Sequence, residues 1–340
     1  MSNLFWLTLY ELDLHRLNRD VYWSDAEYYL SGKGKSLFSF PGFDWLVSDL
    51  VSFGFSPLFL RLFIIIILGF VHMLLFRLTE LKRINKWFVL LVLCNPFFAL
   101  PLIRIMKDTY FLFLLCFILD IYRRRNLFAY IVLLLGFITL PSVRPWSVGL
   151  PLLFLLRDAM VSGQIKKKLL IGVFIISMFS LINIDYIMLW INYLLSGDIG
   201  DYNLSIKNQI LGLARIFFSP GLYRIIHPDI YFKYWMPSLL LSVGIGLLLN
   251  YYLIATFSLK KFVLLLKNNY SISLLFLYVI SAIFVYSFAY AGSVEFRIKA
   301  SILLPLAYIL AKGAVWNTRN LTLVLLKYCI IIAVFVSYGF

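Results

Sequence analysis

The stretch PLFLRLFIIIILGFVHMLLFR, residues 57–77, decides the fold class of this chain of 340 residues. As a helix it is long enough to cross the hydrocarbon core of a bilayer, which takes about 20 apolar residues. Backbone groups in lipid must be hydrogen-bonded within the protein, so such a run forms either a helix or a barrel strand. Barrel strands alternate in polarity over roughly ten residues, whereas this run is about twice as long and shows no such alternation. We therefore expect a membrane-spanning α-helix here.

The rest of the chain repeats this apolar character. Hydrophobic residues make up 62% of the sequence and the mean hydropathy is +0.91, whereas a soluble domain is about 45–50% apolar. We predict an all-α, polytopic integral membrane protein with a single domain over residues 1–340 and about ten helices that span the bilayer wholly or in part. The candidate spans are residues 57–77, 87–104, 109–122, 126–142, 146–160, 169–192, 236–257, 271–291, 299–314 and 321–338.

The net charge of +15 is explained by orientation in a membrane, and no nucleic-acid partner is expected. Basic residues accumulate in the cytoplasmic loops of membrane proteins. Successive basic clusters in this chain are separated by two spans, so all of them fall on one side, which we assign to the cytoplasmic side of the membrane. These clusters are Lys82/Arg83/Lys86, Arg123/Arg124/Arg125, Lys166/Lys167/Lys168, Lys260/Lys261/Lys267 and Lys312/Arg319.

This orientation places residues 1–56 outside as a first outer segment and residues 193–235 outside as one larger periplasmic loop. Within that loop, residues 205–217 put four apolar side chains on one helical face, which predicts an amphipathic helix on the outer interface. Twelve of the sixteen acidic residues lie in the outer segments and outer turns. Basic residues on this side are not explained by topology and need a partner, for which an anionic ligand is the natural choice.

The first outer segment contains DVYWSDAEYY, residues 20–29. Its carboxylates could act as general bases or hold a metal, and its aromatic rings could stack on sugars. The alternative is a solvated loop whose aromatic residues anchor at the interface. The residues with candidate roles are Asp20, Asp25, Glu27 and Tyr28.

Two outward helical turns carry cations. In NPFFALPLIRIMKD, residues 95–108, Arg104 and Lys107 lie on one helix face and Asp108 begins the returning helix. This turn could clamp a phosphate, or Asp108 could simply cap the helix or pair with Lys107. In LPSVRPWSVGLP, residues 140–151, prolines on both sides of Arg144 break the apolar stretch and place a guanidinium near the headgroups. A snorkelling arginine is the alternative.

Two further outer motifs combine charge with an adjacent helix. LARIFFSPGLYRIIHPD, residues 213–229, holds Arg215, Arg224 and His227. His227 is either an ordinary polar residue or a general base. SVEFRIKASILLPLAYIL, residues 293–310, carries Glu295 and Arg297 at the outer mouth of a span, as an interfacial ion pair or as part of a ligand site.

Taken together, SDAEYYL, NPFFALPLIRIMKD, RIFFSPGLY and EFRIKASILLP make the chain resemble Wzy-type (EpsG-like) polymerases of O-antigen and capsular polysaccharide. More broadly, it resembles GT-C-like glycosyltransferases that use polyprenyl-linked donors. The motifs extend from residue 20 to about residue 310 and each is degenerate. Enzymes of this kind usually begin with a span, and residues 1–19 are too short and too charged to form one.

The resemblance implies polymerisation of undecaprenyl-diphosphate-linked oligosaccharide repeat units at the outer face of the inner membrane. The expected partners are these lipid-linked oligosaccharides, membrane lipids and a chain-length regulator protein. Arg144, Arg215, Arg224 and Arg297, with Arg104 and Lys107, would bind the diphosphate. Asp20, Glu27, Tyr28, Asp108 and Glu295 would support the site or bind sugar.

The catalytic base would be His227 in a polymerase or Asp25 in an enzyme that adds a single sugar from a polyprenyl phosphate. No cofactor is expected, except a divalent metal in the single-sugar case, and the cysteines show no metal-ligand spacing. A third hypothesis is a lipid-linked oligosaccharide flippase or transporter. Such a protein should carry polar residues along the midplane and on both faces of the membrane.

Overall fold

The computed structural model describes residues 42–81, 107–162, 259–290 and 296–313 continuously, with single positions or pairs at 4, 7–8, 11–12, 30–31, 92–93, 98, 102–103, 105, 212 and 216. Over the continuous ranges every element is a helix and none is a strand. The elements are α3 (Phe43–Ser52), α4 (Pro57–Thr79), α7 (Lys107–Tyr122), α8 (Leu127–Val143), the 3-10 turn η3 (Pro145–Val148), α9 (Gly149–Ser162), α15 (Leu259–Asn268), α16 (Tyr270–Tyr290) and α17 (Phe296–Gly313).

α4 covers the apolar stretch 57–77 and continues to Thr79. Its first turn is defined by Ser56, whose hydroxyl accepts a hydrogen bond from the Phe59 backbone N–H at 3.4 Å, and by Pro57, whose missing N–H costs nothing at this position. Within the described ranges, α4 and residues Tyr270–Ser287 of α16 are long and apolar enough to cross a membrane, with mean hydropathies of 2.6 and 1.9.

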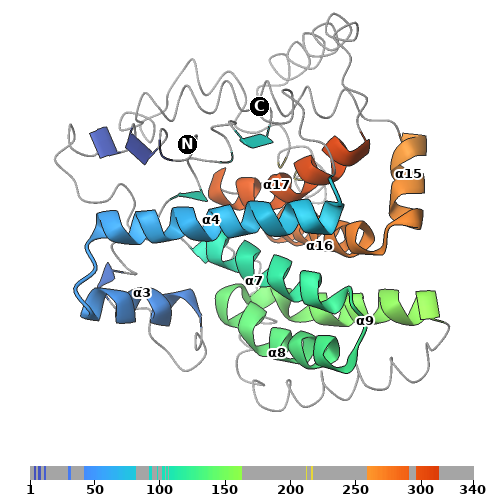
Figure 1. Ribbon diagram of the computed structural model, residues 1–340, viewed down its shortest axis with the longest axis horizontal. Coiled ribbons are helices and arrows are strands. Elements are labelled where there is room, and N and C mark those ends of the chain that lie inside the picture. The colour runs from blue at the N-terminus through green and yellow to red at the C-terminus, as the bar shows by residue number, and fades with distance from the viewer. Residues whose placement is uncertain are drawn as a thin grey trace, which may run out of the picture.

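The described helices run in two opposite directions along the bundle. α4 and α7 run the same way, because Phe70 faces Phe113 with ring centroids 6.3 Å apart and Arg77 reaches Asp120 at 3.1 Å. α8 returns beside α7, and α16 and α17 form a hairpin that packs on α4 and α7. Figure 1 shows α4 lying across the bundle, with α17 above it, α16 partly behind it, and α7, α8 and α9 below it.

These two directions bring the helix ends, and their polar residues, together at two ends of the bundle. We call the end where α7 begins and α8 finishes the Arg144 end, and the opposite end, where α7 finishes and α8 begins, the Arg125 end. At the Arg144 end, Trp146 of η3 donates its indole N–H to the Tyr286 hydroxyl of α16 at 3.0 Å. At the Arg125 end, Arg157 of α9 donates to the Ser273 hydroxyl at the start of α16 at 3.2 Å.

Between the two ends, both the interior and the outer surface are apolar. Large side chains such as Phe111, Phe137, Phe154 and Tyr278 are fully buried where the helices meet. The outward face of α8 is also apolar along its whole length, where Leu127, Phe128, Ile131, Leu134, Leu135 and Ile138 are each 41% to 79% exposed. A helix that is apolar on all sides is typical of a lipid environment.

The all-α prediction is confirmed for the described residues. Predicted spans 57–77, 109–122, 126–142, 271–291 and 299–314 correspond to α4, α7, α8, α16 and α17 within a few residues. Span 146–160 divides into η3 and α9, because Pro145 begins a short 3-10 turn before the helix proper. Spans 169–192, 236–257 and 321–338, nearly all of 87–104, and the predicted amphipathic helix 205–217 lie outside the described residues, apart from isolated positions.

Candidate functional site

The structure describes three of the predicted site residues in full: Lys107, Asp108 and Arg144. Arg297 lies in the first turn of α17, and its side chain is outside the described part. The remaining predicted site residues fall outside the described residues; these are Asp20, Asp25, Glu27, Tyr28, Arg104, Arg215, Arg224, His227 and Glu295.

Arg144 and Asp108 meet at the Arg144 end. Arg144 lies between α8 and η3 with an extended backbone (φ −137°, ψ 99°), as expected for a residue that precedes proline. Its Nη2 donates to Oδ1 of Asp108, which lies in the first turn of α7. The Asp108 side chain is 2% exposed and that of Arg144 is 13% exposed. The guanidinium therefore points into the bundle instead of snorkelling, and the partner of Asp108 across the bundle is Arg144.

An aromatic group lies against this ion pair. Trp146 follows Arg144 by two residues, and its indole is nearly parallel to the ring of Tyr278, with centroids 6.3 Å apart. Phe111 packs against both rings at 6.0 Å. Tyr286 accepts a hydrogen bond from the indole N–H of Trp146, so the C-terminal half of α16 is tied to η3. These contacts fix the backbone that carries Arg144.

Lys107, the third described site residue, interacts electrostatically with a carboxylate that lies outside the predicted motifs. Asp44 lies in the first turn of α3, and α3 packs on α7 through Phe43 and Tyr110, whose ring centroids are 6.0 Å apart. Burial raises the pKa of Asp44, and the positive charge of Lys107 partly offsets this increase. Asp44, Lys107 and Asp108 thus lie at the same end of the bundle.

A second ion pair belongs to the beginning of α4. Arg61 donates from Nη2 to Oε2 of Glu11 at 2.9 Å, and its Nε donates to Oε1, so the pair is bidentate. The Arg61 side chain is 5% exposed. This contact ties residue 11 to the Arg144 end of the bundle, where the first turns of α4 and α7 lie.

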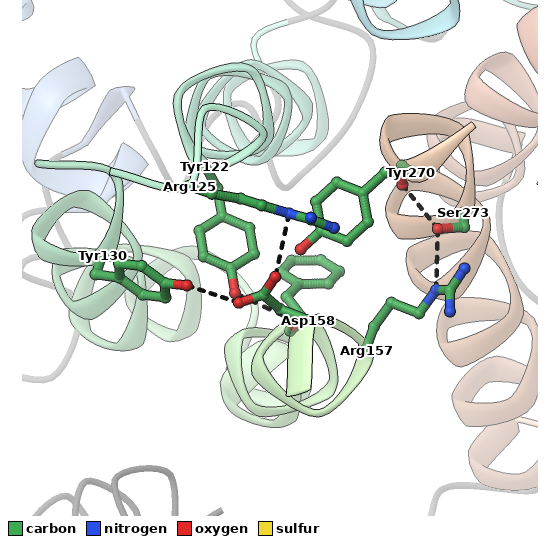
Figure 2. Close-up of polar contacts among 8 residues, drawn as sticks. Tyr122, Arg125, Tyr130, Arg157, Asp158, Tyr270 and Ser273 are labelled. Atoms are coloured by element: carbon green, nitrogen blue, oxygen red, sulfur yellow. Dashed lines mark hydrogen bonds and ion pairs between the residues drawn. The ribbon is translucent and has the colours of Figure 1, made fainter. Parts of the chain in front are cut away.

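The Arg125 end carries a different cluster, which Figure 2 shows. Asp158 of α9 is fully buried; Arg125 pairs with its Oδ1 at 3.2 Å and Tyr130 of α8 donates to its Oδ2 at 2.6 Å. The Arg125 guanidinium also lies 3.8 Å from the ring centroid of Tyr270 of α16. One carboxylate thus joins the ends of α7, α8, α9 and α16, which is a structural role.

Two more contacts close this end. Asp120 of α7 is paired with Arg77 of α4 and with Arg123, each at 3.1 Å. Lys312 at the end of α17 donates to the Glu80 carbonyl that follows α4. In the interior, His72 of α4 shares a hydrogen bond of 2.7 Å with the Tyr308 hydroxyl of α17. Buried charge is therefore present at both ends of the bundle, and the cations are in excess at the Arg125 end.

The cysteines and acidic residues of the described part do not assemble into a metal site. No group of three or more His, Cys, Asp or Glu side chains with metal-binding geometry occurs among these residues. Cys116 is a free, buried thiol of α7 that packs in the core.

Sequence reasoning missed Asp44, Arg61 and Asp158 as parts of polar sites. Arg61 lies within the apolar stretch 57–77, and a charge inside such a run is itself a signal, because it needs a buried partner. Asp158 gives the same signal near the end of a predicted span. Asp44 gives none, since an acidic residue in an outer segment is ordinary until its burial is known.

Comparison with known proteins adds no relative: no family model, curated protein or solved structure matches this chain.

Proposed function

We propose that this chain is a membrane glycosyltransferase that polymerises undecaprenyl-diphosphate-linked oligosaccharide repeat units into O-antigen or capsular polysaccharide. The observation that carries the proposal is the buried Arg144–Asp108 pair at the end of the bundle opposite the arginine clusters. Its support from the sequence is the set of motifs shared with Wzy-type polymerases, because Asp108 belongs to one of them, and its partner Arg144 is the cation of another predicted outer turn.

The proposal includes a topology of about ten spans in a bacterial inner membrane with the Arg144 end facing the periplasm. Two observations support it. The exposed face of α8 is apolar from Leu127 to Ile138, as a lipid-facing helix should be. Arg77, Arg123, Arg124, Arg125 and Lys312 gather at the opposite end, as the positive-inside rule requires of a cytoplasmic face.

Arg144 suits the stabilisation of a leaving diphosphate. In the proposed reaction an acceptor hydroxyl attacks the anomeric carbon, and the bond to the lipid diphosphate breaks with its electron pair staying on oxygen. Negative charge therefore grows on the diphosphate in the transition state, where a fixed cation in a water-poor site is most effective. A guanidinium offers five N–H donors in a rigid plane, so it can bind Asp108 and a phosphate oxygen together.

Asp108 acts in this scheme as a positioning residue. A buried arginine without a carboxylate would adopt other rotamers and would carry a large desolvation cost. The Asp108 carboxylate, held in the first turn of α7, fixes the direction of the guanidinium before substrate arrives. Lys107 adds a second cation beside the same turn.

The substrate test is incubation of the purified protein with lipid-linked repeat units, followed by separation of the products by length. A ladder of products supports the polymerase. A product lengthened by one unit only would contradict it and would favour the GT-C enzyme that adds a single sugar.

A lipid-linked oligosaccharide transporter is the second candidate, and one observation favours it. Buried ion pairs occur at both ends of the bundle, with the His72–Tyr308 pair between them. Transport is indicated if Arg144→Ala leaves glycan synthesis intact but leaves the lipid-linked repeat on the cytoplasmic leaflet. Loss of synthesis with normal translocation favours the polymerase.

A further inference from the structure

Asp44 is a carboxylate at the Arg144 end whose environment is unfavourable to its charge. Its Oδ1 is buried and accepts no hydrogen bond. The helix that carries it, α3, is held on α7 by packing of Phe43, which is 2% exposed, against Tyr110. The packing of α3 on α7 therefore holds the carboxylate in place. No hydrogen bond to Oδ1 helps to position it.

A purely structural role does not account for this arrangement. Acidic residues in the first turn of a helix stabilise it by capping backbone N–H groups or by favouring the helix dipole from a solvated position. The N-cap of α3 is Gly42, and no side chain caps this helix. A carboxylate oxygen that is buried without a donor instead costs free energy, and titratable groups perturbed by burial beside a specific charge are concentrated at functional sites.

The charged and titratable groups of α7 around Asp44 define its chemistry. Lys107 interacts with it electrostatically, Asp108 follows Lys107 and binds Arg144, and Tyr110 is in the next turn against Phe43. Asp44 thus interacts with one cation that the proposed function assigns to the diphosphate, Lys107, and the next residue along α7, Asp108, binds the other, Arg144. A glycosyl transfer needs this pairing, because the acceptor hydroxyl must lose a proton while the diphosphate gains charge.

We propose that Asp44 is the proton acceptor for the incoming sugar hydroxyl, an inference that rests on the proposed function. The acceptor O–H transfers its proton to the Asp44 carboxylate as its oxygen forms the bond to the anomeric carbon. The bond from that carbon to the diphosphate breaks, and the electron pair leaves with the diphosphate beside Arg144 and Lys107. Protonated Asp44 then returns its proton to water.

This role agrees with the direction of the Asp44 pKa. Burial raises it above the usual value for an aspartate, which makes the carboxylate a stronger base near neutral pH. The rate of sugar transfer should therefore fall, as the pH is lowered, through a pKa higher than that of an ordinary aspartate. The pKa that sets this limb is that of Asp44, through its burial and the positive charge of Lys107; Asp108 and Tyr110 are the other titratable groups at the start of α7, on which α3 packs.

The test compares three variants of the full-length protein in the lipid-linked repeat assay. Asp44→Asn should lower the rate of transfer by about 10²–10⁴-fold, the range for loss of a general base. Asp49→Asn, an exposed aspartate on the same helix, is the matched control and should keep wild-type rate. Asp44→Glu should restore part of the rate and move the acidic limb of the pH profile.

The outcomes separate the two proposals. A wild-type protein that forms no glycosidic bond overturns both. A wild-type protein that polymerises, with an Asp44→Asn variant of equal rate and unchanged pH profile, overturns only the role of Asp44. Thermal unfolding of each variant shows whether a lower rate results from misfolding. If Asp44→Asn does not fold, the Asp44→Glu variant decides. An active Asp44→Glu protein whose acidic limb of the pH profile is unshifted also counts against the role.

Discussion

Asp108, Asp120 and Asp158 are each no more than 4% exposed, and each faces a guanidinium from another helix or turn. Removing one partner of such a pair leaves a buried charge, which costs more than the pair itself contributes. The three pairs are therefore strict constraints on how the helix ends are arranged, although each adds little net stability.

The Arg125–Asp158 pair gives a direct stability prediction. Arg125→Ala leaves the fully buried Asp158 carboxylate without its guanidinium. Because Arg125 itself is 37% exposed, the expected loss is about 1–3 kcal/mol, between the values for exposed and buried pairs. Arg124→Ala, one residue earlier and exposed, should change stability by no more than about 0.5 kcal/mol. Unfolding in mixed detergent micelles measures both, and equal losses would contradict this account of the cluster.

Asp44 gives a prediction that depends on pH. Its folded-state pKa is raised by burial, so its contribution to stability is fully present below the unfolded pKa of about 3.9 and is lost as the pH rises through the folded-state pKa. Asp44→Asn, which is always neutral, should therefore unfold at a higher temperature than wild type at pH 7. This difference should close as the pH approaches 4. If Asp44→Asn were less stable than wild type at pH 7, the folded protein would favour the ionised form of Asp44, which would contradict this account.

The sequence could identify Arg144 and Asp108 as site residues but could not pair them. Each stands out because charge beside an apolar run is costly. Their contact depends on α8 returning along α7, and no local pattern encodes that adjacency. Asp44 could not be found at all, because its burial depends on the docking of α3 on α7.

At the level of the helices, α7 and α8 approach each other closely at one glycine. Gly136 of α8 is buried, and a Cβ at this position would lie 3.1 Å from Cδ1 of Ile118. Small residues allow close approach of helices in membranes, where van der Waals packing replaces the hydrophobic effect. This close approach brings the end of α8, and with it Arg144, to the first turn of α7.

A bulky residue at this position should separate the two helices. Gly136→Leu is expected to cost about 1–3 kcal/mol, as overpacking does, and to lower sugar transfer because Arg144 moves away from Asp108. The matched control is Gly69→Leu in α4, where a Cβ meets nothing within 4 Å. Thermal unfolding in detergent tests the pair of variants. Similar melting temperatures for the two would rule out close packing at Gly136.

Helices were predictable where long apolar runs end at charges or prolines, as for α4 and α8. α15 was not, because Leu259–Asn268 mixes lysines with apolar residues, and this pattern indicates only a basic cluster. The division of span 146–160 into η3 and α9 was also not foreseen. Pro145 fixes the backbone at that point, but the turn formed there depends on contacts of Trp146 with α16.

At the scale of the molecule, the two polar ends predict a membrane orientation. Phe53, before α4, lies at the Arg144 end and is 80% exposed; Arg124, between α7 and α8, is exposed at the Arg125 end. In a chain with Cys94, Cys116 and Cys329 replaced by alanine, Phe53→Cys should react with an impermeant maleimide in intact cells. Arg124→Cys should react only after permeabilisation. The reverse pattern would place the Arg144 end in the cytoplasm and contradict a periplasmic site.

The most direct measurement is polymerisation of lipid-linked repeats by two double variants that neutralise matched ion pairs. Asp108→Asn with Arg144→Gln removes the pair at the Arg144 end; Asp158→Asn with Arg125→Gln removes the one at the Arg125 end. Removing both partners avoids an unpaired buried charge, so both proteins should fold. The account predicts that the first makes no product ladder while the second keeps the wild-type ladder. A wild-type ladder from the Asp108→Asn, Arg144→Gln protein would contradict a catalytic site built on Arg144.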